Sequence, residues 1–151
     1  MSSILKALKR AYDVKKERNW DTVYYAVDLH GVCLKSNYEN NSYEWINEEA
    51  KTTLQLISNM EGNKIILWSS VHKFEMVNIL RFFKEANIDI HGFNTNISEP
   101  SNDVSYFGDK FYFSVLFDDK AGFDPETDWT VVNEFITNLN TINKLESAYG
   151  K

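Results

Sequence analysis

The sequence has little of what marks secreted, membrane-spanning or nucleic-acid-coating proteins. Cys33 is its single cysteine, so no internal disulfide can form, and a cytoplasmic location fits. No stretch is long and apolar enough to span a bilayer, and the N-terminus lacks the apolar core of a signal peptide. The net charge of −6 excludes a bulk attraction to nucleic acid or anionic membranes, although it allows a local basic site.

The sequence does contain enough apolar material for one packed domain. Hydrophobic residues make up 43% of the chain and aromatic residues 15%, which argues against disorder. No internal repeat or linker divides the chain. We therefore expect a single domain over residues 1–151, with an extra N-terminal helix within residues 1–20. The segment between Val32 and Trp45 is too short for a substantial cap domain.

Helix and strand patterns alternate along the chain. Apolar residues at helical spacing predict helices at residues 3–18, 45–60, 71–85 and 130–145. Short apolar runs predict strands at residues 22–27, 64–68, 88–93 and 111–117. Polar stretches predict loops at residues 36–43 and 94–110. This alternation predicts an α/β fold, a three-layer α/β/α Rossmann-like domain with a mainly parallel central sheet.

Two of the predicted strands end in carboxylates. The first is followed by Asp28, and the fourth by Asp118 and Asp119. Ligands of open parallel sheets gather at the carboxyl ends of the strands, so we expect these three side chains to meet. Three uncompensated carboxylates would repel one another, which favours a bound cation. Taken singly, each aspartate could also be a turn or helix-capping residue.

Further polar groups flank the strands. Gly31 lets the backbone turn sharply and approach a ligand. Ser69 follows the second predicted strand, and Lys110 precedes the fourth. A hydroxyl and a lysine can hold phosphate oxygens while an aspartate attacks the phosphorus. The alternatives are that Ser69 or Ser70 caps the next helix and that Lys110 is a solvated loop residue.

The order of these residues resembles that of the haloacid dehalogenase-like phosphohydrolase superfamily. The matching stretches are Asp28-Leu29-His30-Gly31-Val32, Ile65-Ile66-Leu67-Trp68-Ser69, Lys110 and Val115-Leu116-Phe117-Asp118-Asp119. The resemblance covers about residues 23–124, most of the chain. The motifs are short, and their order, spacing and strand context together make the match specific. The small, nearly capless members of the superfamily are the most similar.

The resemblance implies a nucleophile and a metal site. Asp28 would form an aspartyl-phosphate and would also bind Mg²⁺. The backbone carbonyl of His30 and the carboxylate of Asp118 would be further ligands, with Asp119 acting through water. Mg²⁺ suits such an oxygen-only site, in which it keeps several waters.

The resemblance also implies three other catalytic residues. Ser69 would hydrogen-bond the transferring phosphoryl group, and Lys110 would neutralise charge on Asp28 and the phosphate. Phosphatases of the superfamily usually have a second aspartate where this chain has His30, as general acid and then base. Histidine can serve as both, because its reference pKa of about 6.5 is near neutral, although a nearby metal opposes its charged form.

These residues predict an enzyme, with one alternative. The expected function is a Mg²⁺-dependent phosphatase that hydrolyses a phosphomonoester, either a small molecule such as a nucleotide or a bulky group such as a nucleic-acid end. The alternative is a weak or inactive module that binds a partner, which His30 favours. A receiver domain has its acidic pair after the first strand, so it does not fit. A zinc site at His30 and Cys33 lacks a second ligand pair.

The remaining candidates have simpler explanations. His72 and His91 lack partners at a recognisable spacing, so we expect them on the surface or in packing. The basic face of the first helix is expected to be solvated, or to contact an acidic partner. Core positions are expected for the four tryptophans, Trp20, Trp45, Trp68 and Trp129, with Trp45 as a candidate exception because the loop before it could line the entrance of the site.

Overall fold

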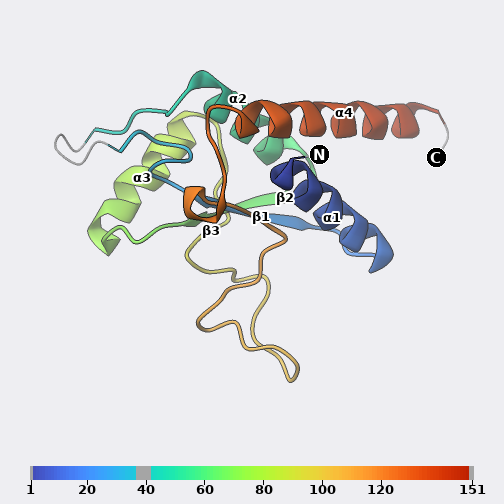
Figure 1. Ribbon diagram of the computed structural model, residues 1–151. Coiled ribbons are helices and arrows are strands. Elements are labelled where there is room, and N and C mark those ends of the chain that lie inside the picture. Colours follow the sequence, from blue (N-terminus) through green and yellow to red (C-terminus); the bar gives the residue numbers. More distant parts are fainter. Residues whose placement is uncertain (1, 37–41, 150–151) are drawn as a thin grey trace.

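The computed structural model describes residues 2–36 and 42–149, in which one four-stranded sheet forms the centre (Figure 1). Its strands are β1 (Val23–Asp28), β2 (Asn63–Trp68), β3 (Gly92–Phe93) and β4 (Val115–Phe117). All pair in parallel, in the order β3-β2-β1-β4. The prediction of an α/β fold with a mainly parallel sheet is confirmed. Residues 37–41 of the predicted loop 36–43 lie outside the described residues.

The helices begin close to where their apolar patterns predict. They are α1 (Ser3–Glu17), α2 (Glu48–Asn59), α3 (Lys73–Glu85) and α4 (Asp128–Ala148), with a short 3-10 helix η1 (Asp119–Ala121). The Asn47 side chain caps α2 by accepting a 2.8 Å hydrogen bond from the Ala50 amide. None of the described helices is long and apolar enough to cross a membrane.

The helices gather on one face of the sheet. The steps β1-α2-β2 and β2-α3-β3 move in the same direction across the sheet, so right-handed crossovers place α2 and α3 on the same side. The last helix, α4, packs against both α1 and α2. Strand residues such as Tyr25 and Val27 meet Leu8, Leu54 and Ile136 of these helices in the main buried cluster. This cluster is the hydrophobic core of the protein.

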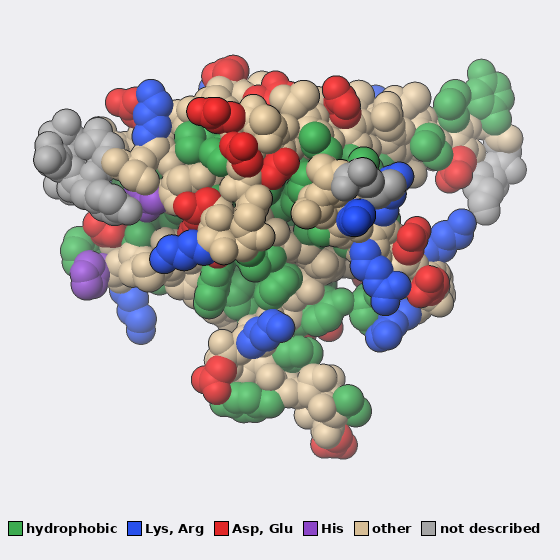
Figure 2. All heavy atoms as spheres, viewed as in Figure 1, with side chains coloured by type: hydrophobic (Ala, Val, Ile, Leu, Met, Phe, Trp, Pro, Cys, Tyr) green, Lys and Arg blue, Asp and Glu red, His purple; other side chains and the backbone are tan. Residues whose placement is uncertain are grey.

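The opposite face is covered by an irregular segment, residues 94–114, which returns the chain from β3 to β4. Tyr24, Ala26 and Ile66 point to this side and form a second buried cluster with Phe111, to which no described helix contributes. The segment hangs below the sheet in Figure 1, and hydrophobic side chains continue onto it in Figure 2. The third layer is therefore this aromatic-rich segment.

The two outer strands are shorter than predicted. Strand β3 comprises two residues of the predicted 88–93, and β4 comprises three of the predicted 111–117. Ile88 and Phe111 are nonetheless buried, with 2% and 7% of their surface exposed. An apolar run reports burial, and these side chains are buried by tertiary packing without strand pairing.

The predicted apolar stripe of α3 is mostly exposed. Phe74 is 74% exposed and Val77 is 60% exposed, while Phe83 is buried together with Ile79. Because the neighbouring strand β3 is so short, the sheet offers α3 little surface, and only one side of the helix is covered.

Figure 2 also shows lysine and arginine side chains gathered over α1, as its basic face predicts.

Candidate functional site

Three aspartates meet at the carboxyl ends of β1 and β4. Asp28 is the last residue of β1, and Asp118 directly follows β4. These strands are neighbours, with Val27 in register with Phe117. One carboxylate oxygen from each of Asp28, Asp118 and Asp119 lies within 4.8 Å of the others. The predicted meeting of these side chains is confirmed.

Local backbone geometry holds the aspartates in place. Oδ1 of Asp28 accepts a 2.9 Å hydrogen bond from the Leu29 amide. Oδ1 of Asp118 accepts one of 2.9 Å from the Lys120 amide and so caps η1. Gly31 has a φ of +88°, and a Cβ there would lie 2.8 Å from Oδ2 of Asp119. Glycine at this position therefore lets Asp119 approach the loop after β1.

The cluster is electrostatically unbalanced. The pKa of Asp28 is raised to about 7, mainly by burial and also by the charges of Asp118 and Asp119, against the lowering effect of the Leu29 amide. A divalent cation would relieve this repulsion, and the oxygen-only donor set is of the kind that hard cations prefer. The three aspartates could thus hold a metal ion.

A cavity of about 440 Å³ opens over this cluster, and four of the predicted site residues line it: Asp28, His30, Ser69 and Asp119. Ser69 is held there by the Asn94 side chain. The Ser69 amide donates to Oδ1 of Asn94 at 2.8 Å, and Nδ2 of Asn94 donates to the Ser69 carbonyl at 2.6 Å. These bonds tie the end of β2 to the end of β3. The carbonyl of His30 as a metal ligand stays a prediction.

Lys110 is not brought to this cavity. It lies in the segment 94–114, with Nζ 5.8 Å from the centre of the Phe113 ring, and it lines a separate cavity with Tyr106 and Phe111. The physical reason is that Lys110 belongs to the segment that covers the other face of the sheet, where its neighbour Phe111 packs in the second buried cluster. Lys120 lines the aspartate cavity instead, two residues after Asp118.

Three of the residues that line the cavity were not among the site residues predicted from the sequence. His72, Glu75 and Tyr43 line the cavity, and His72 also stacks on Phe74 with ring centroids 5.4 Å apart. His72 and Glu75 follow the carboxyl end of β2, so the strand-end rule that found Ser69 could have found them. Tyr43 comes from the loop before Trp45, the segment expected to line the entrance of the site.

One alternative at this edge is wrong, and one expectation is confirmed. Neither Ser69 nor Ser70 caps α3, whose N-cap is His72, and both serines line the cavity instead. The loop before Trp45 does line the cavity, through Ser42 and Tyr43, whereas Trp45 itself packs against Phe82 with ring centroids 5.0 Å apart.

Cys33 has a structural position beneath the site. It is fully buried, and its thiol donates to the backbone carbonyl of Asp28 at 3.2 Å. Burial raises the pKa of this thiol, and the Asp28 charge adds to the effect.

Comparisons with known proteins show a fold and name no family. No protein-family model matches this chain, and no curated protein matches it. A solved structure of a conserved protein from Bacteroides thetaiotaomicron is similar, with a TM-score of 0.60 and 21% identity. The match covers 86% of this chain and 99% of that one. At this identity the similarity concerns the parallel α/β fold alone.

Proposed function

We propose that this protein is a Mg²⁺-dependent phosphatase that hydrolyses a phosphomonoester through an aspartyl-phosphate on Asp28. The observation that carries the proposal is the meeting of Asp28, Asp118 and Asp119 at the ends of neighbouring parallel strands, beneath a cavity. A hydroxyl from Ser69 and an ammonium from Lys120 line the same cavity. Carboxylates, a hydroxyl and an ammonium are the groups that phosphoryl transfer to an aspartate requires.

The three aspartates are the groups that would hold the ion. Asp28 and Asp118 would bind it directly, with Asp119 acting through water as the resemblance implies. Bound there, Mg²⁺ would neutralise the carboxylates and the phosphate so that an anionic ester can approach Asp28. Oδ1 of Asp28 accepts the Leu29 amide, which orients the carboxylate, and Oδ2 would be the attacking oxygen.

The reaction proceeds in two displacements at phosphorus. In the first, Oδ2 of Asp28 bonds to phosphorus, the ester P–O bond breaks, and the leaving oxygen takes a proton from the His30 imidazolium. In the second, a water molecule gives its proton to His30 and attacks phosphorus, the bond to Asp28 breaks, and phosphate leaves. Ser69 donates a hydrogen bond to a phosphoryl oxygen. Lys120 neutralises charge on Asp28 and the phosphate, the role that the resemblance assigned to Lys110.

The cavity suits a substrate larger than phosphate itself. Its volume of about 440 Å³ exceeds that of a phosphate group, and Tyr43 and His72 add ring surface to its walls. A nucleotide, a nucleic-acid end or another bulky phosphomonoester fits this description. Glu75 in the lining disfavours a long polyanion, which agrees with the negative net charge.

The test is phosphate release from p-nitrophenyl phosphate in Mg²⁺ and in EDTA. We expect Mg²⁺-dependent turnover that falls by about 10³-fold or more in Asp28→Asn, because the nucleophile is lost. Asp89→Asn, an exposed carboxylate after α3, is the matched control and should keep full activity. Acid-quenched wild-type protein should carry phosphate on Asp28 by mass spectrometry. Equal background release from wild type and Asp28→Asn would contradict the proposal.

A second candidate function is a metal-binding module without turnover. It is favoured by His30 in place of the usual second aspartate, and by the exposed Phe74 and Val77 on the helix that follows the cavity. This candidate predicts Mg²⁺ binding by calorimetry with no phosphate release from any ester tested. The same assays therefore separate the two functions.

A further inference from the structure

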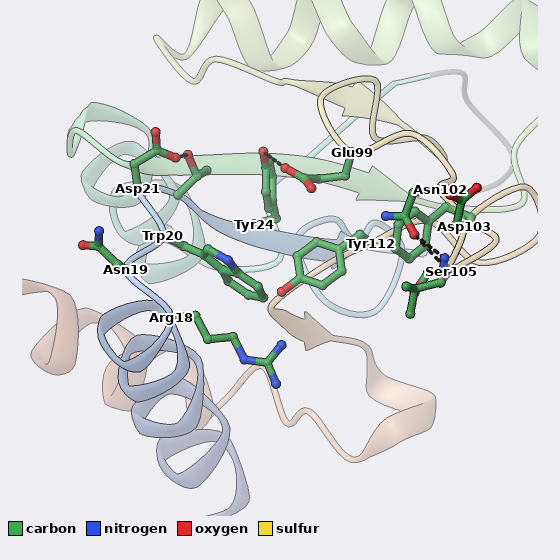
Figure 3. A pocket seen from close by; sticks show the side chains of 13 residues that line it. Arg18, Asn19, Trp20, Asp21, Tyr24, Glu99, Asn102, Asp103, Ser105 and Tyr112 are labelled. Carbon is green, nitrogen blue, oxygen red and sulfur yellow. Dashed lines mark hydrogen bonds between the residues drawn. The ribbon is translucent and has the colours of Figure 1, made fainter.

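A second cavity, of about 770 Å³, opens at the opposite edge of the sheet. One wall comes from residues 18–24, between the end of α1 and the start of β1, and the other from residues 99–112 of the third layer (Figure 3). Tyr24 and Asp28 are four residues apart on β1, which at about 3.3 Å per residue separates them by about 13 Å. The two cavities share no lining residue.

We propose that this cavity binds a small organic polycation of the polyamine class. This second proposal goes beyond the phosphatase proposal and does not depend on it. The cavity combines aromatic rings with an excess of carboxylates. The aromatic lining residues are Trp20, Tyr24, Phe107 and Tyr112. The charged lining residues are Asp21, Glu99 and Asp103, against the single cation Arg18.

The rings are arranged as perpendicular walls. Tyr112 stands at 89° to Trp20 and at 88° to Tyr24, with ring centroids 5.8 Å and 6.0 Å apart. Phe107 adds a further ring at 5.9 Å from Tyr112. In such edge-to-face pairs the edge of one ring lies over a face of the other, and the faces that remain uncovered point in different directions, where they can attract alkylammonium groups.

One ring face in the cavity already receives a cation. The guanidinium carbon of Arg18 lies 5.3 Å from the centre of the Trp20 ring. Trp20 is 39% exposed although its residue type predicts a core position, so the indole is presented to the cavity rather than covered. Figure 3 shows Arg18 below Trp20 and Tyr112, with the carboxylates on the far side of the rings. A ligand ammonium would thus meet the carboxylates away from the Arg18 charge.

The carboxylates are positioned by hydrogen bonds. The Tyr24 hydroxyl donates to Oε2 of Glu99 at 3.1 Å, which holds this carboxylate beside the rings. Oδ1 of Asn102 accepts the amides of Val104 and Ser105, at 2.8 Å and 2.9 Å, and shapes the loop that carries Asp103. Carboxylates that are spaced apart around the aromatic lining can each pair with one ammonium group of a flexible polyamine chain. The same charges disfavour phosphate and nucleotides.

The test is calorimetric titration of the Mg²⁺-saturated protein with spermidine, so that the aspartate cluster is already occupied. We expect saturable binding at one site. Glu99→Gln and Trp20→Leu should each weaken spermidine binding by about tenfold, because the first removes a carboxylate charge and the second removes an aromatic ring face. The matched controls are Glu85→Gln, an exposed carboxylate on α3, and Trp68→Leu, an equally exposed indole outside the cavity. Both should bind like wild type.

Other outcomes overturn the proposal. No saturable heat with spermidine would do so, as would equal weakening by Glu99→Gln and Glu85→Gln, which indicates general charge attraction. Loss of binding in Asp28→Asn would place the ligand at the aspartate cluster. Tighter binding of adenosine than of spermidine would make the cavity a site for planar bases. Circular dichroism of each variant verifies that it is folded.

Discussion

The two edges of the sheet use carboxylates in different surroundings. At the carboxyl edge, Asp28 and Asp118 converge on one point, because their strands are neighbours and both end there. At the amino edge, Asp21 and Glu99 lie apart around aromatic rings. Converging carboxylates suit a small hard cation, whereas dispersed carboxylates among rings suit an extended organic one. Both sites are rich in carboxylates, and they differ in the spacing of the carboxylates and in the aromatic rings around them.

The sharpest way to test the carboxyl edge is to compare its two candidate lysines. Lys120→Met should lower kcat/KM for p-nitrophenyl phosphate by about 10²-fold, since it removes positive charge beside the transferring phosphoryl group. Lys110→Met should stay within about twofold of wild type, because Lys110 lines a different cavity. Steady-state kinetics of the two variants measures this. The reverse ranking would restore the role that the resemblance assigned to Lys110.

The pH dependence of stability tests the electrostatic strain at the same edge. Because the pKa of Asp28 is raised to about 7, the folded state holds this proton more tightly than the unfolded chain. In EDTA the contribution is fully present below about pH 4 and is lost as the pH rises through 7. Asp28→Asn should therefore gain stability relative to wild type over this range, by roughly 2 kcal/mol after allowance for partial exposure.

Urea unfolding of wild type and Asp28→Asn at pH 4, 6 and 8 measures this difference. Because both proteins share every other titrating group, the difference reports Asp28 together with its interaction with Asp118 and Asp119. Saturating Mg²⁺ at pH 8 should reverse the ranking, since only wild type keeps the full set of carboxylates. A stability difference that does not change between pH 4 and 8 would show that the pKa of Asp28 is not raised in the folded protein.

Two glycines offer a smaller, matched comparison between the edges. Gly31 and Gly62 have φ values of +88° and +89°, so alanine at either costs roughly 1 kcal/mol of stability. A Cβ at Gly31 would press on Oδ2 of Asp119, whereas one at Gly62 would lie 3.0 Å from the Asp21 carbonyl. Gly31→Ala should therefore weaken Mg²⁺ binding severalfold by calorimetry, and Gly62→Ala should not. Equal Mg²⁺ affinities would mean that Asp119 takes no part in the site.

The sequence alone was sufficient for the sheet and for the acidic cluster. Apolar runs alternating with helical stripes require parallel pairing, and parallel strands deliver their carboxyl ends to one edge. For this reason the meeting of Asp28 with Asp118, 90 positions away, was predictable. The Ser69 position followed from the same rule.

Only the tertiary structure decided which other side chains join them and how the far edge is built. The sequence does not distinguish a lysine before β4 from a lysine after it, yet the two line different cavities, so Lys120 takes the place of Lys110 beside the aspartates. Likewise, Trp20 is apolar enough for a core but faces a cavity that Tyr112 closes from another layer. The physical reason is that periodicity reports local burial, whereas a cavity depends on distances between segments that no local pattern encodes.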